Sequence, residues 1–139
     1  VVGAVEVAAG EFFSAALLGS GQVIVWGSDA SGVVHVPAAA TNVVSLRAGA
    51  LHLVALRADG TVVAWGSPSD GRTTVPVGLN RVIKIAAGRA HSLALRDDGT
   101  VVAWGYGLQW LGADFCAFRF GQRCRYRGRG AAQPGARFS

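Results

Sequence analysis

A segment of 39 residues recurs along this chain, and the repetition limits the possible folds more than any other feature of the sequence. The stretch "RAGALHLVALRADGTVVAWG" at 47–66 returns as "AAGRAHSLALRDDGTVVAWG" at 86–105, with 14 of 20 positions identical. A weaker copy, "AAGEFFSAALLGSGQVIVWG", occupies 8–27. A fixed period of this length predicts stacked supersecondary units, because one such unit cannot bury its own apolar face.

Two residue types keep strict register through all three copies, a glycine near the start and a tryptophan near the end. Three residues after the glycine, the second and third copies have histidine where the first has phenylalanine. The structural repeat positions are Gly10, Gly49, Gly88, Trp26, Trp65, Trp104, His52 and His91. Because Phe13 can neither bind a metal nor transfer a proton, we predict that the histidines fill the unit, with a ring nitrogen bonded to backbone. The tryptophans are predicted to pack between neighbouring units.

The residues of each copy favour short antiparallel strands. Val, Ile, Thr and Trp dominate, and turn residues fall every few positions. Asp59-Gly60 is a strong hairpin signal, and the third copy has the same pair. A looser strand at 73–76, "TTVP", would complete a unit of four strands, with its proline at an outer edge. We therefore predict an all-β fold: a partial β-propeller of about two and a half four-stranded blades, followed by an irregular tail.

The motif A-G-x-x-H-S-L-A-L-x-x-D-G-T-V-x-A-W-G, matched at 86–105 and nearly as well at 47–66, resembles the repeat of the regulator of chromosome condensation family. The resemblance covers about residues 1–105 and implies a β-propeller of about seven blades. The short linkers with "TTVP" are similar to those of bacterial members, which include the secreted type II β-lactamase-inhibitor protein. The chain starts at Val1 and contains no methionine, so we expect a fragment of a larger propeller whose missing blades would be its neighbours.

The resemblance also implies a kind of function. The founding eukaryotic member of the family is a guanine-nucleotide exchange factor, and both it and the inhibitor present a propeller face to a folded protein. We therefore predict a non-catalytic protein-binding scaffold whose partner is another protein. The alternative is a regulator of a specific enzyme, of the exchange-factor or β-lactamase-inhibitor type.

The loops are the candidate binding positions. Alternate loops of an antiparallel meander lie on one face, so the loop after each repeated glycine should share a face with the loop after each repeated tryptophan. These loops differ most between the copies, and recognition residues often lie on loops held by a rigid scaffold. Weak constraint on the loops would explain the same variation. The possible protein-binding positions are Glu11, Phe12, Asp29, Ala50, Leu51, Asp70, Arg72 and Arg89.

Other function classes find no support in the sequence. It contains no nucleophile–base arrangement, metal-ligand cluster or glycine-rich phosphate loop, so we expect no catalytic residue, metal or cofactor. No apolar run is long enough to cross a bilayer, and we expect no membrane partner. No signal segment opens the sequence, and the compartment stays open; bacterial relatives are compatible with a secreted or cell-surface location.

The charge divides the chain into a repeat region, 1–105, and a basic tail, 106–139. The repeat region has seven basic and seven acidic residues, so the net charge of +5 lies entirely in the tail. We therefore do not expect the repeats to bind nucleic acid. In the tail, arginines alternate with aromatic residues and glycine, as in RNA-binding segments, which makes nucleic-acid binding a further alternative.

We favour a different origin for the tail, a frameshift near residues 106–108. The stretch "QRCRYRGRG" at 122–130 can be back-translated so that the frame shifted by one base reads N-V-V-A-I-A-A-G, similar to "NVVSLRAG" at 42–49. Under this hypothesis the tail is disordered or a frameshift product, and its arginines and both cysteines have no selected function. The nucleotide sequence distinguishes the two interpretations.

Overall fold

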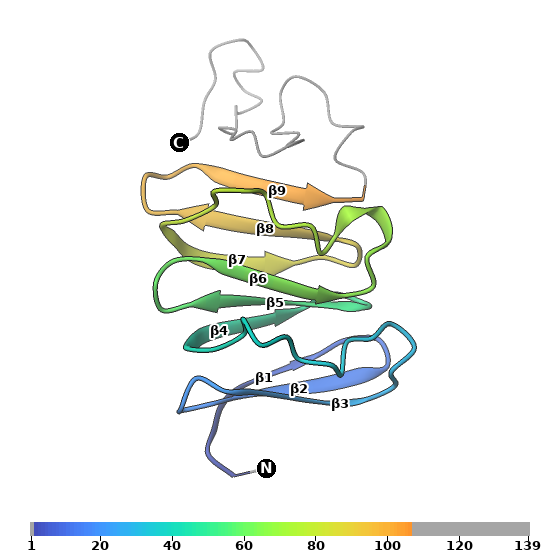
Figure 1. Cartoon of the computed structure of the whole chain (residues 1–139). Helices are drawn as coiled ribbons and strands as arrows, with labels where there is room; N and C mark the ends of the chain where they lie inside the picture. The colour runs from blue at the N-terminus through green and yellow to red at the C-terminus, as the bar shows by residue number, and fades with distance from the viewer. Residues whose placement is uncertain (1, 107–139) are drawn as a thin grey trace.

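The computed structural model describes residues 2–106, which form three antiparallel sheets of three strands each. Figure 1 shows the sheets stacked in chain order. Strand β4 contacts β1 and β2, and β7 contacts β4 and β5, so successive repeats are spatial neighbours. The strands are β1 (Ala4–Ala9), β2 (Phe13–Leu18) and β3 (Val23–Gly27) in sheet A, β4 (Val43–Ala48), β5 (His52–Arg57) and β6 (Val62–Gly66) in sheet B, and β7 (Val82–Ala87), β8 (His91–Arg96) and β9 (Val101–Gly105) in sheet C. The prediction of an all-β stack of blades is confirmed.

Among the described residues the predicted fourth strand does not form, and each sheet there has three strands rather than four. The segment 73–76 belongs to a connector that follows the short 3-10 helix η1 (Ser69–Gly71). Local turns use its backbone groups: Thr74 N donates to Gly71 O at 3.1 Å, and Leu79 N donates to Pro76 O at 3.3 Å. Pro76 has no N–H to offer a ladder. The connector instead packs Val75 and Leu79 against the core between sheets B and C.

The hairpins follow the turn chemistry of the sequence. Gly60 has a φ of +84°, a conformation that costs glycine little and other residues more. Beside it, Asp59 Oδ1 accepts hydrogen bonds from the backbone N–H of Thr61 at 3.1 Å and from its hydroxyl at 2.5 Å. The Thr61 hydroxyl and N–H hold the pKa of the Asp59 carboxyl below its ordinary value. The Asp-Gly-Thr sequence therefore sets the turn between β5 and β6.

The repeated glycine and the ring three residues later form one packing unit. A Cβ added at Gly49 would collide with the imidazole of His52, and a Cβ at Gly10 would collide with the ring of Phe13. Gly49 N also donates to His52 O at 2.8 Å, which closes the turn that places the ring over the glycine. A flat ring packed on a glycine explains why phenylalanine and histidine exchange at this position.

The apolar cores lie between successive sheets, and a tryptophan closes each one. Trp65 and Trp104 are 7% and 4% exposed. Trp65 Nε1 donates to Val33 O at 2.8 Å, in the connector between sheets A and B. Trp104 Nε1 donates to Arg72 O at 3.0 Å, in the following connector. Each indole therefore fastens its own blade to the connector that precedes it.

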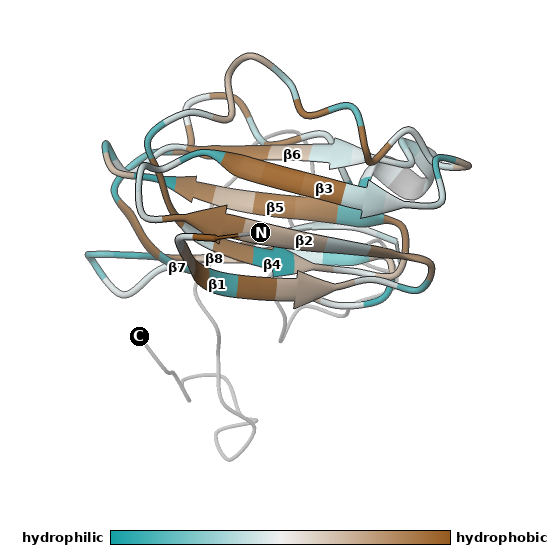
Figure 2. Cartoon of the chain, turned by 90° about the horizontal axis from the view of Figure 1, so that it is seen from below, coloured by the Kyte–Doolittle hydropathy of each residue, from teal (hydrophilic) through white to brown (hydrophobic). Residues whose placement is uncertain are grey.

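In sheet A, the face that sheets B and C bury against the preceding sheet is exposed to solvent. Trp26 is 46% exposed, and Val7 is 78% exposed although the corresponding Leu46 and Ile85 are buried. Figure 2 looks onto this side of the stack and shows apolar residues along β1 and β3. Among the described residues no sheet lies against this face, which accounts for the difference in burial.

Candidate functional site

The structure brings the two sets of predicted loops together. The residue after each Trp-Gly pair donates its N–H to the loop that follows the repeated glycine of the same blade. Ser28 N donates to Phe12 O at 2.8 Å, Ser67 N to Leu51 O at 2.9 Å, and Tyr106 N to Ala90 O at 2.9 Å. These loops form one face of the stack, which we call the loop face.

A row of hydrogen bonds connects the loop face from blade to blade. Glu11 N donates to Ala50 O at 2.9 Å, and Ala50 N donates to Arg89 O at 3.2 Å. Arg89 also places a guanidinium nitrogen 3.7 Å from a carboxylate oxygen of Glu11. Three of the predicted binding positions, one from each blade, therefore lie side by side on this face.

The remaining predicted positions lie around this row or on the connectors. Phe12 is exposed and Leu51 is half-buried, each next to its blade's member of the row. Asp29 is exposed, and its Oδ2 lies 2.8 Å from Nε2 of His35. Asp70 belongs to η1.

Arg72, the last predicted position, is buried, with 7% of its surface exposed. Its Nε donates to Ser69 O at 3.0 Å. This hydrogen bond fixes the side chain near the start of the connector. Arg72 is therefore part of the packing between sheets B and C.

His52 lies in a buried polar cluster, and one of its partners is a side chain. Its Nε2 lies 3.0 Å from Ser92 Oγ, a side-chain hydroxyl rather than a backbone group. Ser92 Oγ in turn donates to Arg72 O at 3.2 Å. Burial, followed by the positive charges of Arg72 and His91, lowers the pKa of His52 from 6.5 to about 4. A neutral, buried imidazole of this kind links sheets B and C.

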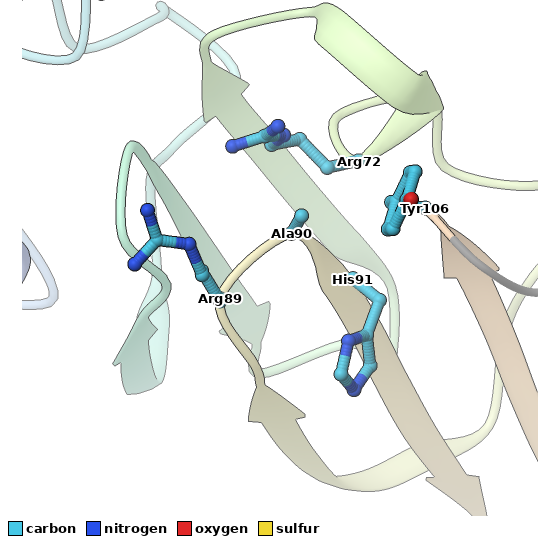
Figure 3. A pocket seen from close by; sticks show the side chains of 5 residues that line it. All are labelled: Arg72, Arg89, Ala90, His91 and Tyr106. Carbon is cyan, nitrogen blue, oxygen red and sulfur yellow. The ribbon is translucent and has the colours of Figure 1, made fainter.

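A cavity of about 300 Å³ opens on the loop face of the third blade. Its lining residues are Arg72, Arg89, Ala90, His91 and Tyr106. Figure 3 shows the two guanidinium groups on one side of Ala90 and the Tyr106 ring on the other, while the imidazole of His91 points away from them. The polar groups that face this opening therefore come from the two arginines and the tyrosine.

Sequence reasoning missed Tyr106 and Ser92. Tyr106 was assigned to the tail, yet it follows Trp104-Gly105 as Ser28 and Ser67 follow the earlier Trp-Gly pairs. The 39-residue register could have found it. Ser92 carries no such signal, because its partners are a histidine 40 residues away and a carbonyl that only the folded connector supplies.

Several classes of site have no counterpart between residues 2 and 106. No group of three or more His, Cys, Asp or Glu side chains there could hold a metal ion. No helix in the same range is long and apolar enough to cross a membrane. The arginine-rich segment and both cysteines of the tail lie outside the described residues.

The comparison with protein families decides what the repeats are. The model of the regulator of chromosome condensation (RCC1) repeat matches residues 4–33, 43–72 and 82–108, more than half of the chain. The chain belongs to the RCC1 repeat family. Each matched segment begins at the first strand of a sheet and extends into the connector or turn after the third strand, so one RCC1 repeat corresponds to one blade. A search of the curated proteins gave no match.

Solved structures agree with the assignment to RCC1 repeats. Yeast RCC1 (Prp20), solved with bound Kap60, is 27% identical, with a TM-score of 0.62 over 73% of this chain and 29% of that one. Human WBSCR16 is 25% identical, with a TM-score of 0.67 over 76% of this chain and 33% of that one. Prp20p from Saccharomyces cerevisiae, in a study of its binding to Gsp1p and histones, is 23% identical with a TM-score of 0.64, over 73% of this chain and 30% of that one. The chain thus spans about a third of the length of these structures.

Proposed function

We propose that this chain is a non-catalytic protein-binding scaffold and that its loop face contacts the partner. One observation carries the proposal: side chains of different chemistry occupy the same repeat position on the loop face, while the strands beneath them keep the same lengths and pairing. Residues Glu11, Ala50 and Arg89 occupy one repeat position on neighbouring blades, yet they are an acid, a methyl group and a base. Rigid strands that hold dissimilar loops are typical of a recognition surface.

The solved relatives support the same proposal. Yeast RCC1 is described bound to Kap60, and Prp20p is described as binding Gsp1p and histones. Protein binding is therefore compatible with this fold. Regulation of an enzyme would be a special case of such binding, with the enzyme as the partner on the loop face.

Site-specific photo-crosslinking tests the proposal. A photoreactive phenylalanine analogue is placed at Phe12, which is 65% exposed on the loop face, and in a matched variant at Ser20, which is exposed in the β2–β3 hairpin at the other end of the strands. We expect a protein adduct in cells from position 12 and none from position 20. Equal labelling from both positions, or labelling from position 20 alone, would contradict a binding surface on the loop face.

A further inference from the structure

We propose that the cavity on the third blade is a recognition site for a carboxylate side chain of the protein partner. The inference rests on the proposed function and adds the chemistry of the contact. The cavity presents the guanidinium groups of Arg72 and Arg89 together with the exposed ring of Tyr106 (Figure 3). A guanidinium offers parallel N–H donors that match the two oxygens of a carboxylate, and a phenol hydroxyl can donate a further hydrogen bond.

The fold itself does not require this set of side chains. One period earlier, the positions of Arg72, Arg89 and Tyr106 are occupied by Val33, Ala50 and Ser67. The second blade nevertheless has the same strands, the same turns and a corresponding indole bond to the connector. The cationic lining is therefore particular to the third blade.

The two arginines contribute in different ways. Arg72 is almost fully buried and is held at Nε by Ser69 O, so its position is fixed before any ligand arrives. Arg89 has 81% of its side chain exposed and can follow a ligand into the opening.

The molecule already shows a carboxylate near this site. A carboxylate oxygen of Glu11 lies 3.7 Å from the Arg89 guanidinium, in a loose contact across the loop face. A carboxylate from a partner would replace this contact. Glu11 should therefore act as an internal competitor, and its removal should strengthen binding.

Size and charge favour a single acidic side chain over a polyanion. A volume of about 300 Å³ is at the lower end for ligand cavities and suits a side chain. Residues 1–105 carry equal numbers of acidic and basic side chains, so they produce little of the long-range field that draws nucleic acid to a protein. The attraction is confined to the cavity.

The test is a titration of the full chain, followed through the backbone amide signals of Ala90 and Tyr106 in ¹H–¹⁵N correlation spectra. The probes are an acetylated, amidated triglutamate peptide, its triglutamine counterpart and inorganic phosphate. We expect triglutamate to shift both amides and triglutamine to leave them unchanged. Arg89→Ala should weaken triglutamate binding at least about tenfold, through loss of a charge-assisted hydrogen-bond pair.

Two further variants separate the site from general effects of charge or folding. Glu11→Gln should tighten triglutamate binding by about threefold or more, a gain that misfolding cannot produce. Lys84→Ala removes one exposed positive charge from β7 of the same blade and should change affinity less than about twofold. Equal effects of Arg89→Ala and Lys84→Ala, binding of triglutamine as strong as that of triglutamate, or phosphate binding tighter than triglutamate binding would each overturn the carboxylate assignment.

The outcomes distinguish this site from the broader scaffold. Position-12 adducts that persist unchanged in the Arg89→Ala variant would overturn the carboxylate site and leave the scaffold in place. Triglutamate binding that depends on Arg89, without any adduct from position 12, would support the site and count against the protein-binding scaffold.

Discussion

The tryptophan at one position of the repeat contributes differently to stability from blade to blade, as Trp26, Trp65 and Trp104 show. All three end the third strand of a blade, but within residues 2–106 only Trp65 and Trp104 have a connector beneath them and a carbonyl acceptor for the indole N–H. Trp26 is half exposed. The repeat places the residue, and the neighbouring blade decides what it contributes to stability.

We expect Trp65→Phe to lower the free energy of unfolding by about 1 to 3 kcal/mol, because Val33 O would stay buried without its donor. Trp26→Phe should change it by less than about 0.5 kcal/mol, since the indole there is half exposed to solvent. Urea unfolding followed by circular dichroism measures both. A loss at position 26 as large as that at position 65 would contradict the account.

His52 should make stability depend on pH in a defined window. Its pKa is about 4 in the folded chain and 6.5 when unfolded, so the unfolded state binds the proton more readily. Neutral His52 makes its full contribution to the free energy of unfolding above pH 6.5, and this contribution is lost as the pH falls toward 4. We expect a loss on the order of 1 to 2 kcal/mol across this window after allowance for solvent screening.

The control for this pH effect is His52→Phe, which copies Phe13 at the equivalent position of the first blade. The unfolding free energy of both proteins is measured from pH 7 to pH 4. As the pH falls, the unfolding free energy of the wild-type protein should decrease more than that of the variant. A constant difference over that range would show that His52 does not titrate as described.

Among the elements, the β5–β6 hairpin depends on Gly60, because its turn requires a backbone conformation with positive φ. Gly60→Ala should cost about 1 to 2 kcal/mol, because the φ of +84° is unfavourable for a residue with a Cβ. Gly19→Ala, in the corresponding region of the first blade, has no positive φ, and the added carbon would make only ordinary van der Waals contacts, so its cost should be below about 0.5 kcal/mol. Thermal unfolding compares the two, and equal losses would exclude the turn conformation as the cause.

The strands could be predicted from sequence because their signals are local. Asp59-Gly60 sets a turn, alternation sets the strands beside it, and the 39-residue period transfers both to the other blades. The segment 73–76 misled the prediction because β-branched residues also suit a connector that packs one side chain on a core, as Val75 does. Only the turns around it, fixed in the folded chain, use up the backbone groups that a fourth strand would need.

The candidate site was predictable only in part for the same reason. The shared face of the loops follows from the alternation of antiparallel strands, and Arg72 and Arg89 were both singled out. Their convergence with Tyr106 on one cavity depends on how the connector of one blade crosses to the next. That crossing is a tertiary contact between residues 17 and more positions apart, and no local pattern encodes it.

At the scale of the whole molecule, the open side of sheet A should govern behaviour in solution. Val7 lies where Leu46 and Ile85 are buried against the preceding sheet, so its exposure marks a surface suited to pack against another apolar face. We expect the full chain to self-associate as concentration rises and Val7→Lys to reduce this association by about tenfold. Sedimentation velocity over a dilution series measures it.

The matched control is Val77→Lys, at a valine that is even more exposed but lies in a turn of the connector. It should leave association unchanged. If both lysines had the same effect, added charge rather than the side of sheet A would be responsible.

The row of backbone hydrogen bonds from Glu11 through Ala50 to Arg89 gives the stack a direction. Each amide in the row donates a hydrogen bond to a carbonyl of the following blade. The indoles of Trp65 and Trp104 donate to the connector that precedes their own blade. Anything that lengthens the stack must point the same way. A copy turned by a two-fold axis would set donor against donor at one end and acceptor against acceptor at the other. Growth in a single sense leads to a closed circle or to an open spiral, and the rotation between adjacent blades selects between the two.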